Sequence, residues 1–309
     1  MKKNVFLSLL FVLLSIPYFH SESDAMNTAE IIIPLQFQDA RSFSDGMAAV
    51  KKDGMWGYID RLGQWVIPPE YPYPVGDYSS GLAYIGKQFL NKNGKPAFGG
   101  AMFENARSFK PKGDNALAAV QISGKWGFID INGESVISPK YDDAGDFADN
   151  GEGLSLAPIK VGGIWGYIDR KGRELVMPKF DYAWSYSGEF ATVMAEGSVG
   201  YIDRAGIYKI NPQFIHGGAF YNGRAPVRVG SKTGYINDKG QLVIQAVFND
   251  GGEFNNGLAP VATDKRWGYI NVNGKMVIPP QYDKAKPFSE GLAAVEQDGL
   301  WGYINYKNY

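Results

Sequence analysis

One short sequence recurs along the chain and constrains its fold more than any other feature. The segment 301–305, Trp-Gly-Tyr-Ile-Asn, has a close copy in residues 56–60, Trp-Gly-Tyr-Ile-Asp. The longer segments around these copies, residues 31–60 and 276–305, align without a gap. A fixed repeat of this kind predicts an array of similar supersecondary units, each of which packs on its neighbours.

The repeat has eight copies, which we number as units one to eight. An anchor glycine marks seven of them, at Gly57, Gly127, Gly166, Gly200, Gly234, Gly268 and Gly302. A degenerate copy, residues 88–91, fills the long first interval as unit two. From Gly166 onward the spacing is constant at 34 residues, whereas units two to four are irregular. The sequence therefore predicts eight tandem units of about 34 residues.

Each unit is predicted to contain three short strands. In the last unit, residues 292–296 and 301–305 are joined by Asp298-Gly299, and Asn273-Gly274 makes the equivalent turn into the third strand of unit seven. Asp-Gly and Asn-Gly are strong hairpin signals, because a type I′ turn needs positive φ at both central residues. The third strand carries proline in most copies, so it should be an edge strand. The Trp-Gly strand is then central.

The central strand is apolar on both faces. Alternation places Trp301 and Tyr303 on one face and Gly302 and Ile304 on the other. A sheet that is buried on both sides needs neighbouring sheets above and below it. We expect Trp and Tyr of one unit to pack over Gly and Ile of the next, with the glycine making room for the tryptophan.

The ends of the chain favour a ring. The last unit lacks its third strand, and residues 31–37 form an orphan third strand before the first complete unit. Pairing the two completes an eighth blade, which predicts an all-β, propeller-like ring closed by the N-terminal strand. The alternative is an open β-repeat superhelix in which residues 31–37 cap one end.

Composition excludes several classes of function. The 31 basic and 32 acidic residues leave a net charge of −1, so we expect no nucleic-acid partner. Cysteine is absent, which excludes disulfides, thiolate metal sites and a cysteine nucleophile. Histidine occurs only at His20 and His216, which leaves no pair of imidazoles for a metal or for acid–base chemistry. We expect no cofactor, metal or catalytic site.

The acids of the repeat are better explained by turn geometry than by catalysis. Asp60, Asp130, Asp169 and Asp203 end the central strand, but asparagine takes the same place in other units. A side-chain oxygen that caps its own turn suits both residue types, whereas a general acid requires the carboxylate. A hydrolase that pairs two such acids across a central pore remains as a distant alternative.

The N-terminus has the features of an export signal. Lys2 and Lys3 precede an apolar run at residues 5–14, and Ser23-Asp24-Ala25 offers small residues for cleavage after Ala25. We therefore divide the chain into a signal peptide, residues 1–25, and a single repeat domain, residues 26–309. The expected location is the periplasm, the cell envelope or the exterior, with no membrane span in the mature chain.

The repeat resembles the bacterial WG-repeat (KWG) family. The resemblance rests on Trp-Gly-Tyr-Ile-Asp, on Asn-Gly-Lys and on Val-Ile-Pro-Pro-x-Tyr-Asp followed by Phe-Ser-Glu-Gly-Leu-Ala, and it extends from about residue 31 to the C-terminus. It implies secreted or envelope-associated interaction modules without an assigned reaction, and it transfers no site residue. Unit two departs from the pattern, and Val199 and Thr233 replace tryptophan in units five and six.

Residues outside the repeat consensus are the better candidates for function. Tyr71, Tyr73, Trp184 and Tyr186 place exposed-looking aromatic rings in connectors of irregular units, so we expect functional residues between about Tyr71 and Tyr186. Such rings suit peptides or sugars, although they also fill gaps between units. The function expected is a non-catalytic exported scaffold that binds a protein or peptide, and the alternative is lectin-like binding of envelope or extracellular polysaccharide.

Overall fold

The structure is a computed structural model that describes residues 29–148 and 155–306. The predicted signal peptide, residues 1–25, lies outside these ranges. Within them, no helix is both long enough and apolar enough to cross a bilayer.

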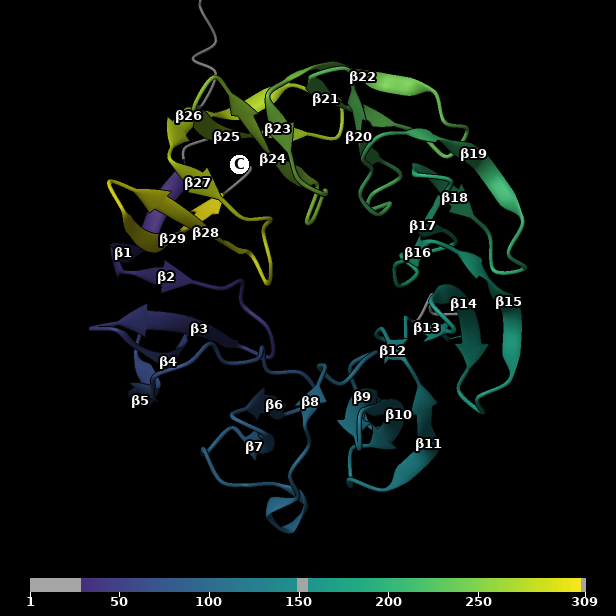
Figure 1. The fold of residues 1–309 in the computed structure, drawn as a ribbon. Coiled ribbons are helices and arrows are strands. Elements are labelled where there is room, and N and C mark those ends of the chain that lie inside the picture. Colours follow the sequence, from purple (N-terminus) through teal and green to yellow (C-terminus); the bar gives the residue numbers. More distant parts are fainter. Residues whose placement is uncertain (1–28, 149–154, 307–309) are drawn as a thin grey trace, which may run out of the picture.

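The described strands form eight antiparallel sheets arranged as a β-propeller (Figure 1). Seven sheets have three or four strands, and unit two has a reduced sheet of two strands. The central strands are β4 (Met55–Asp60), β7 (Gln88–Asn91), β10 (Lys125–Asp130), β14 (Ile164–Asp169), β18 (Ser198–Ile202), β21 (Lys232–Ile236), β25 (Arg266–Asn271) and β29 (Leu300–Tyr306). Their hairpin partners are β3 (Met47–Lys52), β6 (Leu82–Ile85), β9 (Leu117–Ile122), β13 (Leu156–Val161), β17 (Ala191–Ala195), β20 (Ala225–Val229), β24 (Leu258–Thr263) and β28 (Leu292–Gln297).

The third strands of the units, of which all but residues 242–248 carry proline, form the outer edges of the sheets, as predicted. They are β1 (Ala29–Phe37), β5 (Trp65–Tyr71), β11 (Ser135–Tyr141), β15 (Glu174–Phe180), β19 (Tyr208–Phe214), β22 (Leu242–Phe248) and β26 (Met276–Tyr282). They lie at the periphery of the ring in Figure 1. An edge strand does not need every N–H group, so proline is tolerated there.

The connectors contribute a fourth strand that was not predicted. These two-residue strands lie at the opposite edge of six of the eight sheets, toward the centre of the ring (Figure 1): β2 (Asp39–Ala40), β8 (Asn105–Ala106), β12 (Asp143–Ala144), β16 (Tyr182–Ala183), β23 (Asp250–Gly251) and β27 (Lys284–Ala285). A 3-10 turn, η1 (Phe98–Gly100), follows the reduced sheet of unit two. The three predicted strands are therefore the outer part of a four-stranded blade.

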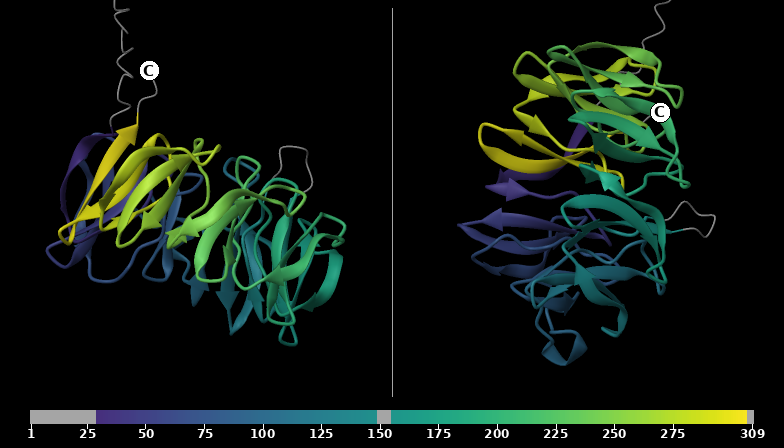
Figure 2. Two further views of the ribbon diagram at one scale, coloured as in Figure 1. Left: turned by 90° about the horizontal axis from the view of Figure 1, so that it is seen from above. Right: turned by 45° about the vertical axis from the view of Figure 1, so that its right-hand side comes forward.

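The ring is closed by the N-terminal strand, as predicted. Strand β1 pairs antiparallel with β29, with Ile33 opposite Tyr303 and Phe37 opposite Trp301. The sheet that contains both ends has the order β1-β29-β28-β27. Figures 1 and 2 show the first and last strands side by side in this blade. The open superhelix is therefore excluded in this structure.

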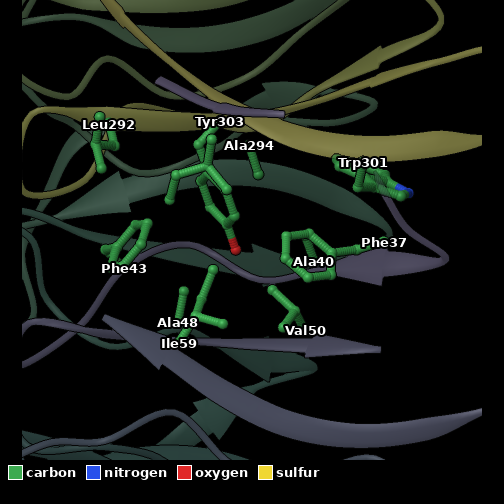
Figure 3. Packing of buried hydrophobic residues seen from close by; sticks show 11 residues of the cluster. Phe37, Ala40, Phe43, Ala48, Val50, Ile59, Leu292, Ala294, Trp301 and Tyr303 are labelled. Atoms are coloured by element: carbon green, nitrogen blue, oxygen red, sulfur yellow. The ribbon is translucent and has the colours of Figure 1, made fainter. Parts of the chain in front are cut away.

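The packing between blades matches half of the prediction. Trp301 and Tyr303 of unit eight lie in one buried cluster with Ile59, Ala48 and Val50 of unit one. Figure 3 shows the Tyr303 ring pointing from its own sheet toward the sheet of Ile59. Aromatic residues of one unit therefore pack over the isoleucine of the next, and this burial is a main stabilising term, about 2 kcal/mol for each large side chain.

The predicted role of the glycine is wrong. A Cβ atom added to Gly57 would lie 2.6 Å from the carbonyl oxygen of Ile67 and 2.8 Å from the nitrogen of Pro69, both in the outer strand of the same blade. The register between the two strands shifts at this glycine: Trp56 pairs with Tyr71, whereas Tyr58, only two residues later, pairs with Ile67. The outer strand thus bulges over the central strand, and only glycine leaves room for it. The other six anchor glycines meet equivalent backbone.

The interpretation of the strand-ending acids as turn caps is supported. The Oδ1 atom of Asp60 accepts hydrogen bonds of 2.9 Å from the backbone N–H groups of Leu62 and Gln64. Asn271 makes the same two bonds, to Asn273 and Lys275. Because carboxylate and amide do the same task, the chemistry of the position is local hydrogen bonding.

Candidate binding surface on the inner wall of the ring

The edge of each blade that faces the centre of the ring forms a surface that we call the inner wall. We define two positions on it in every unit. The first inner position is the residue directly after the short strand, or the equivalent residue in units two and six, and the second inner position is the residue that follows it. The first inner position holds Arg41, Gly76, Arg107, Gly145, Trp184, Gly218, Gly252 and Lys286 in units one to eight. The second inner position, just before the next buried aromatic residue, holds Ser42, Asp77, Ser108, Asp146, Ser185, Ala219, Glu253 and Pro287.

The backbone of the first inner position is held in the same way in most units. The tyrosine of the preceding central strand donates its hydroxyl hydrogen to this carbonyl, as from Tyr58 to Gly76 at 2.6 Å and from Tyr235 to Gly252 at 2.9 Å. The bonds to Trp184, Gly218, Lys286 and Arg41 are equivalent. The backbone is thus fixed by the repeat, whereas the side chain is free to vary from glycine to arginine to tryptophan.

Basic side chains at the first inner position cover the tryptophan of their own blade. The guanidinium carbon of Arg41 lies 5.8 Å from the Trp56 ring centroid, and that of Arg107 lies 5.3 Å from the Trp126 centroid. Lys286 is 5.0 Å from the Trp301 ring. A cation over an aromatic face is attractive, so these residues seal the inner ends of three clefts between blades.

Acidic side chains at the second inner position face some of these cations. Arg41 forms an ion pair with Asp77 at 3.7 Å. Arg107 pairs with Asp143 at 3.2 Å, and it lines one depression of about 610 Å³ together with Asp146. Burial raises the pKa of Asp146, and the positive charge of Arg107 opposes that rise. Units one to four therefore present a mixed-charge wall.

The four aromatic residues predicted from the sequence lie in different environments. Tyr73 is 44% exposed, lies 6.4 Å from the half-buried Tyr71 ring, and lines the depression with Arg41 and Arg107. Tyr71 packs against the core cluster below it. These two residues are neighbours, but only Tyr73 offers a ring to a ligand.

Trp184 belongs to a second group of rings. It is 39% exposed and lies 4.5 Å from Tyr182, which in turn lies 5.0 Å from Trp165 of the preceding blade. Sequence reasoning missed Tyr182, which lies in the short strand β16 two positions before Trp184. Among the described residues, no ring contact joins this group to Tyr73.

The expectation that Tyr186 is exposed is wrong. Its side chain is only 4% exposed, and its hydroxyl donates a 2.9 Å hydrogen bond to the carbonyl of Asp203. Tyr186 lies 4.9 Å from Tyr167, in the place that Phe288 takes beside Tyr269. It is a core residue of the repeat with an added hydroxyl, at the position that Phe288 occupies in unit eight.

His216 and the carboxylates around Lys112 are the other polar groups of interest. His216 is exposed on a connector, and its own carbonyl accepts a bond from the Arg228 amide. In the part of the chain that the structure describes, no three His, Cys, Asp or Glu side chains are placed to hold a metal ion. At the rim, Lys112 of unit three bridges Asp45 and Glu290 at 3.2 Å each, so these two carboxylates neutralise a cation.

Known proteins with this fold are similar in shape but remote in sequence. The eukaryotic initiation factor has a TM-score of 0.53 at 13% identity, covering 92% of this chain and 90% of that chain. The WD40 domain of SCAP from fission yeast has a TM-score of 0.50 at 12% identity, covering 91% and 98%. A virginiamycin B lyase from Staphylococcus aureus has a TM-score of 0.48 at 13% identity, covering 90% and 99%. At such identities these likenesses describe the fold alone.

The family comparison covers most of the repeat array. No curated protein matches the chain in sequence. The model described as "WG containing repeat" matches residues 27–56, 56–87, 126–163, 165–197, 200–232, 234–267 and 267–301. The stretch between residues 88 and 125, where the sheet is reduced to two strands, is the one longer interval without a match. Since the seven matches span well over half of the sequence, the chain belongs to the WG-containing repeat family.

Proposed function

We propose that this protein is a non-catalytic scaffold that binds a protein or peptide on the inner wall of its ring. The observation that carries the proposal is the contrast at the first inner position. Tyrosine hydroxyls hold its backbone in a repeated geometry, while its side chains include Arg41, Trp184 and Lys286. A rigid frame that presents unlike side chains toward one centre is suited to recognition.

The proposal of a non-catalytic role rests on how the acids are used. The strand-ending carboxylates cap turns, and asparagine replaces them in other units. The rim carboxylates Asp45 and Glu290 are occupied by Lys112. These acids therefore have structural partners that account for them without a reaction.

Peptide selection tests the binding role. A displayed library of random peptides would be selected on the purified domain, residues 26–309, and enriched peptides would be measured against Arg41→Ala and Trp184→Ala. We expect at least one of these variants to weaken binding tenfold or more. Leu62→Ala is the matched control, because Leu62 is 76% exposed on a hairpin turn away from the inner wall. Peptides that bind all inner-wall variants as well as the wild type would contradict the proposal.

Polysaccharide binding is the second candidate, and the adjacent, tilted rings of Tyr182 and Trp184 favour it. Both rings are 39% exposed, and flat apolar faces of this kind suit sugar rings. A glycan array would decide between the two ligand classes. Selective sugar binding that is abolished by Trp184→Ala would overturn the proposal of a protein partner alone.

We further propose that the protein acts outside the cytoplasm after removal of residues 1–25. The basic pair Lys2-Lys3, the apolar run at residues 5–14 and the small residues before position 26 support this. N-terminal sequencing of the protein from cell fractions is the test. We expect a mature chain that begins at Met26 in the periplasmic or extracellular fraction, and a cytoplasmic chain that retains the leader would refute it.

A further inference from the structure

At two boundaries a base of one blade stands near an acid of the next. The base stands at the first inner position of one unit and the acid at the second inner position of the next. Arg41 of unit one pairs with Asp77 of unit two at 3.7 Å. Arg107 of unit three and Asp146 of unit four line the same depression, and the charge of Arg107 opposes the rise that burial causes in the pKa of Asp146.

The boundary between units six and seven keeps the acid and lacks the base. Glu253 stands at the second inner position of unit seven, but Gly218 stands at the first inner position of unit six. The two are adjacent, since a Cβ atom added to Gly218 would lie 3.2 Å from Glu253 Oε1. Among the described residues, no basic side chain forms an ion pair with Glu253. Burial raises the pKa of Glu253, and the 2.8 Å hydrogen bond from the Ala219 amide opposes that rise.

The same boundary also lacks its tryptophan. Unit six has Thr233 where other units carry the tryptophan that fills the cleft between blades. Unit five lacks this tryptophan too, with Val199 in its place, but there Trp184 at the first inner position supplies a large ring. Unit six therefore has neither a tryptophan in its central strand nor a large side chain at its first inner position.

The result is an open cleft of about 560 Å³ on the inner wall. Glu253 and Thr233 provide polar groups in its lining, and Pro226 and Pro287 provide apolar walls. The glycine pairs 217–218 and 251–252 form part of its surface with backbone alone. The basic residues that line it do not close it: Arg228 donates to the carbonyl of Ser231 at 3.1 Å, and the side chain of His216 is exposed.

We propose that this cleft binds an arginine side chain of the partner polypeptide, whose guanidinium pairs with the carboxylate of Glu253. The inference rests on the proposed function, because it specifies what the peptide must carry. Arginine is the base at the boundaries of units one and two and of units three and four, in an ion pair with Asp77 and in the same depression as Asp146, and its planar fork fits a carboxylate. The prolines suit its aliphatic stem, and the partner's cation compensates a carboxylate whose burial is otherwise unfavourable.

The first test uses small probes of defined charge. Acetyl-Gly-Arg-Gly-amide would be titrated into the isotope-labelled domain, and shifts of the Ala219 and Glu253 amide signals would be followed by NMR. The citrulline peptide has the same shape without the charge, and the lysine peptide carries a compact charge. We expect saturable binding of the arginine peptide, at least tenfold weaker binding of citrulline and intermediate binding of lysine. Equal binding of arginine and citrulline, or no saturable shift with arginine, would overturn the proposal.

The second test uses variants that keep the fold. Glu253→Gln should weaken binding of the arginine peptide tenfold or more, whereas Glu174→Gln, which alters an exposed acid on the outer strand β15, should leave it unchanged. Thr233→Trp restores the side chain of other units and should fill the cleft and abolish binding. Circular dichroism melts would confirm that each variant is folded. Unchanged binding in Glu253→Gln or in Thr233→Trp would contradict the site.

The two proposals fail separately. If selected peptides bind the inner wall but neither contain arginine nor respond to Glu253→Gln, this cleft is not the site and the scaffold proposal stands. If the arginine probe binds through Glu253 but no polypeptide is ever enriched by selection, the cleft is a cation site and the scaffold proposal fails.

Discussion

The hydroxyl of Tyr303 donates a 2.7 Å hydrogen bond to the carbonyl oxygen of Arg41, which lies 262 positions earlier in the chain. The same bond joins Tyr235 to Gly252 and Tyr269 to Lys286 over only 17 positions. The last blade therefore meets the first through the contact that most neighbouring blades use. Ring closure uses no contact of its own kind. The strength of the closing boundary can therefore be compared directly with that of a boundary inside the array.

Removing this hydroxyl should measure whether the ring is closed in solution. Tyr303→Phe leaves the packing intact but deprives a buried carbonyl of its donor, so we expect a loss of about 1 kcal/mol in the free energy of unfolding. Urea denaturation would be compared with that of Tyr235→Phe, which makes the same change inside the array. A loss in Tyr235→Phe with none in Tyr303→Phe would indicate an open ring.

The closing strand offers a matched pair of side chains. Ile33 of β1 is only 1% exposed and lies in the cluster with Tyr303, whereas Ile31 of the same strand is 49% exposed. Ile33→Ala should lower the free energy of unfolding by about 2 to 4 kcal/mol, because it leaves a cavity. Ile31→Ala should change it by less than about 0.5 kcal/mol. Equal effects in chemical denaturation would contradict the assigned register of β1.

The bulge over the central glycine predicts an unusual sensitivity. In Gly57→Ala the new methyl group would meet the backbone of Ile67 and Pro69 at 2.6 to 2.8 Å, so the outer strand must move. We expect a cost of about 2 kcal/mol or more, in the range of overpacked cores. Gly54→Ala is the control, with open space but φ of +82°, and should cost about 1 kcal/mol through backbone strain. Thermal and urea unfolding of both variants would show whether the steric clash at Gly57 costs more stability than the backbone strain at Gly54.

The turn caps predict a dependence of stability on pH. Burial tends to raise the pKa of Asp130, but hydrogen bonds from the amides of Glu134 and Asn132 outweigh it and lower the pKa below its ordinary value. A carboxyl group whose pKa is lower in the folded state stabilises the fold at pH values above its pKa in the unfolded chain. That contribution is lost as pH falls through the folded-state pKa, below about 4.

Asp130→Asn should keep the cap and remove this part of the acid sensitivity. Asp130→Ala should remove the cap and cost about 1 kcal/mol at pH 7. The measurement is the urea midpoint from pH 7 to pH 3 for wild type and both variants. An Asn variant as unstable as the Ala variant at pH 7 would show that charge, and not turn geometry, is what the position supplies.

The repeat made the arrangement of strands predictable. Turn signals such as Asn273-Gly274 and the prolines of the third strand fixed the order within a blade, and the orphan strand at residues 31–37 indicated closure. The two-residue inner strands were missed because so short a strand has no period of its own. Their positions are defined by pairing with β3 and its equivalents and not by local sequence.

The side-chain environments were predictable only in part. Alternation along a strand assigns each residue to a face of the sheet, but it does not reveal a bulge in the partner strand. The anchor glycine was therefore predicted to contact the tryptophan of the next unit, whereas it contacts the outer strand of its own blade. The adjacent prolines Pro68-Pro69 and Pro279-Pro280 opposite Gly57 and Gly268 were the available signal. The proposed arginine cleft lies outside residues 71–186, because it arises from what units six and seven lack, and missing side chains become visible only when neighbours are placed in space.

The pairing of β1 with β29 has a consequence for how the protein is made. Strand β1 leaves the ribosome first, but its only sheet partner is the last strand to be synthesised. Until β29 is synthesised, an apolar sheet edge stays unpaired while seven units assemble. An exposed edge of this kind can pair with another chain. Quality control in the cell would therefore act on a nearly complete molecule. Truncation anywhere before residue 300 would leave β1 and the last remaining blade without the pairing that closes the ring.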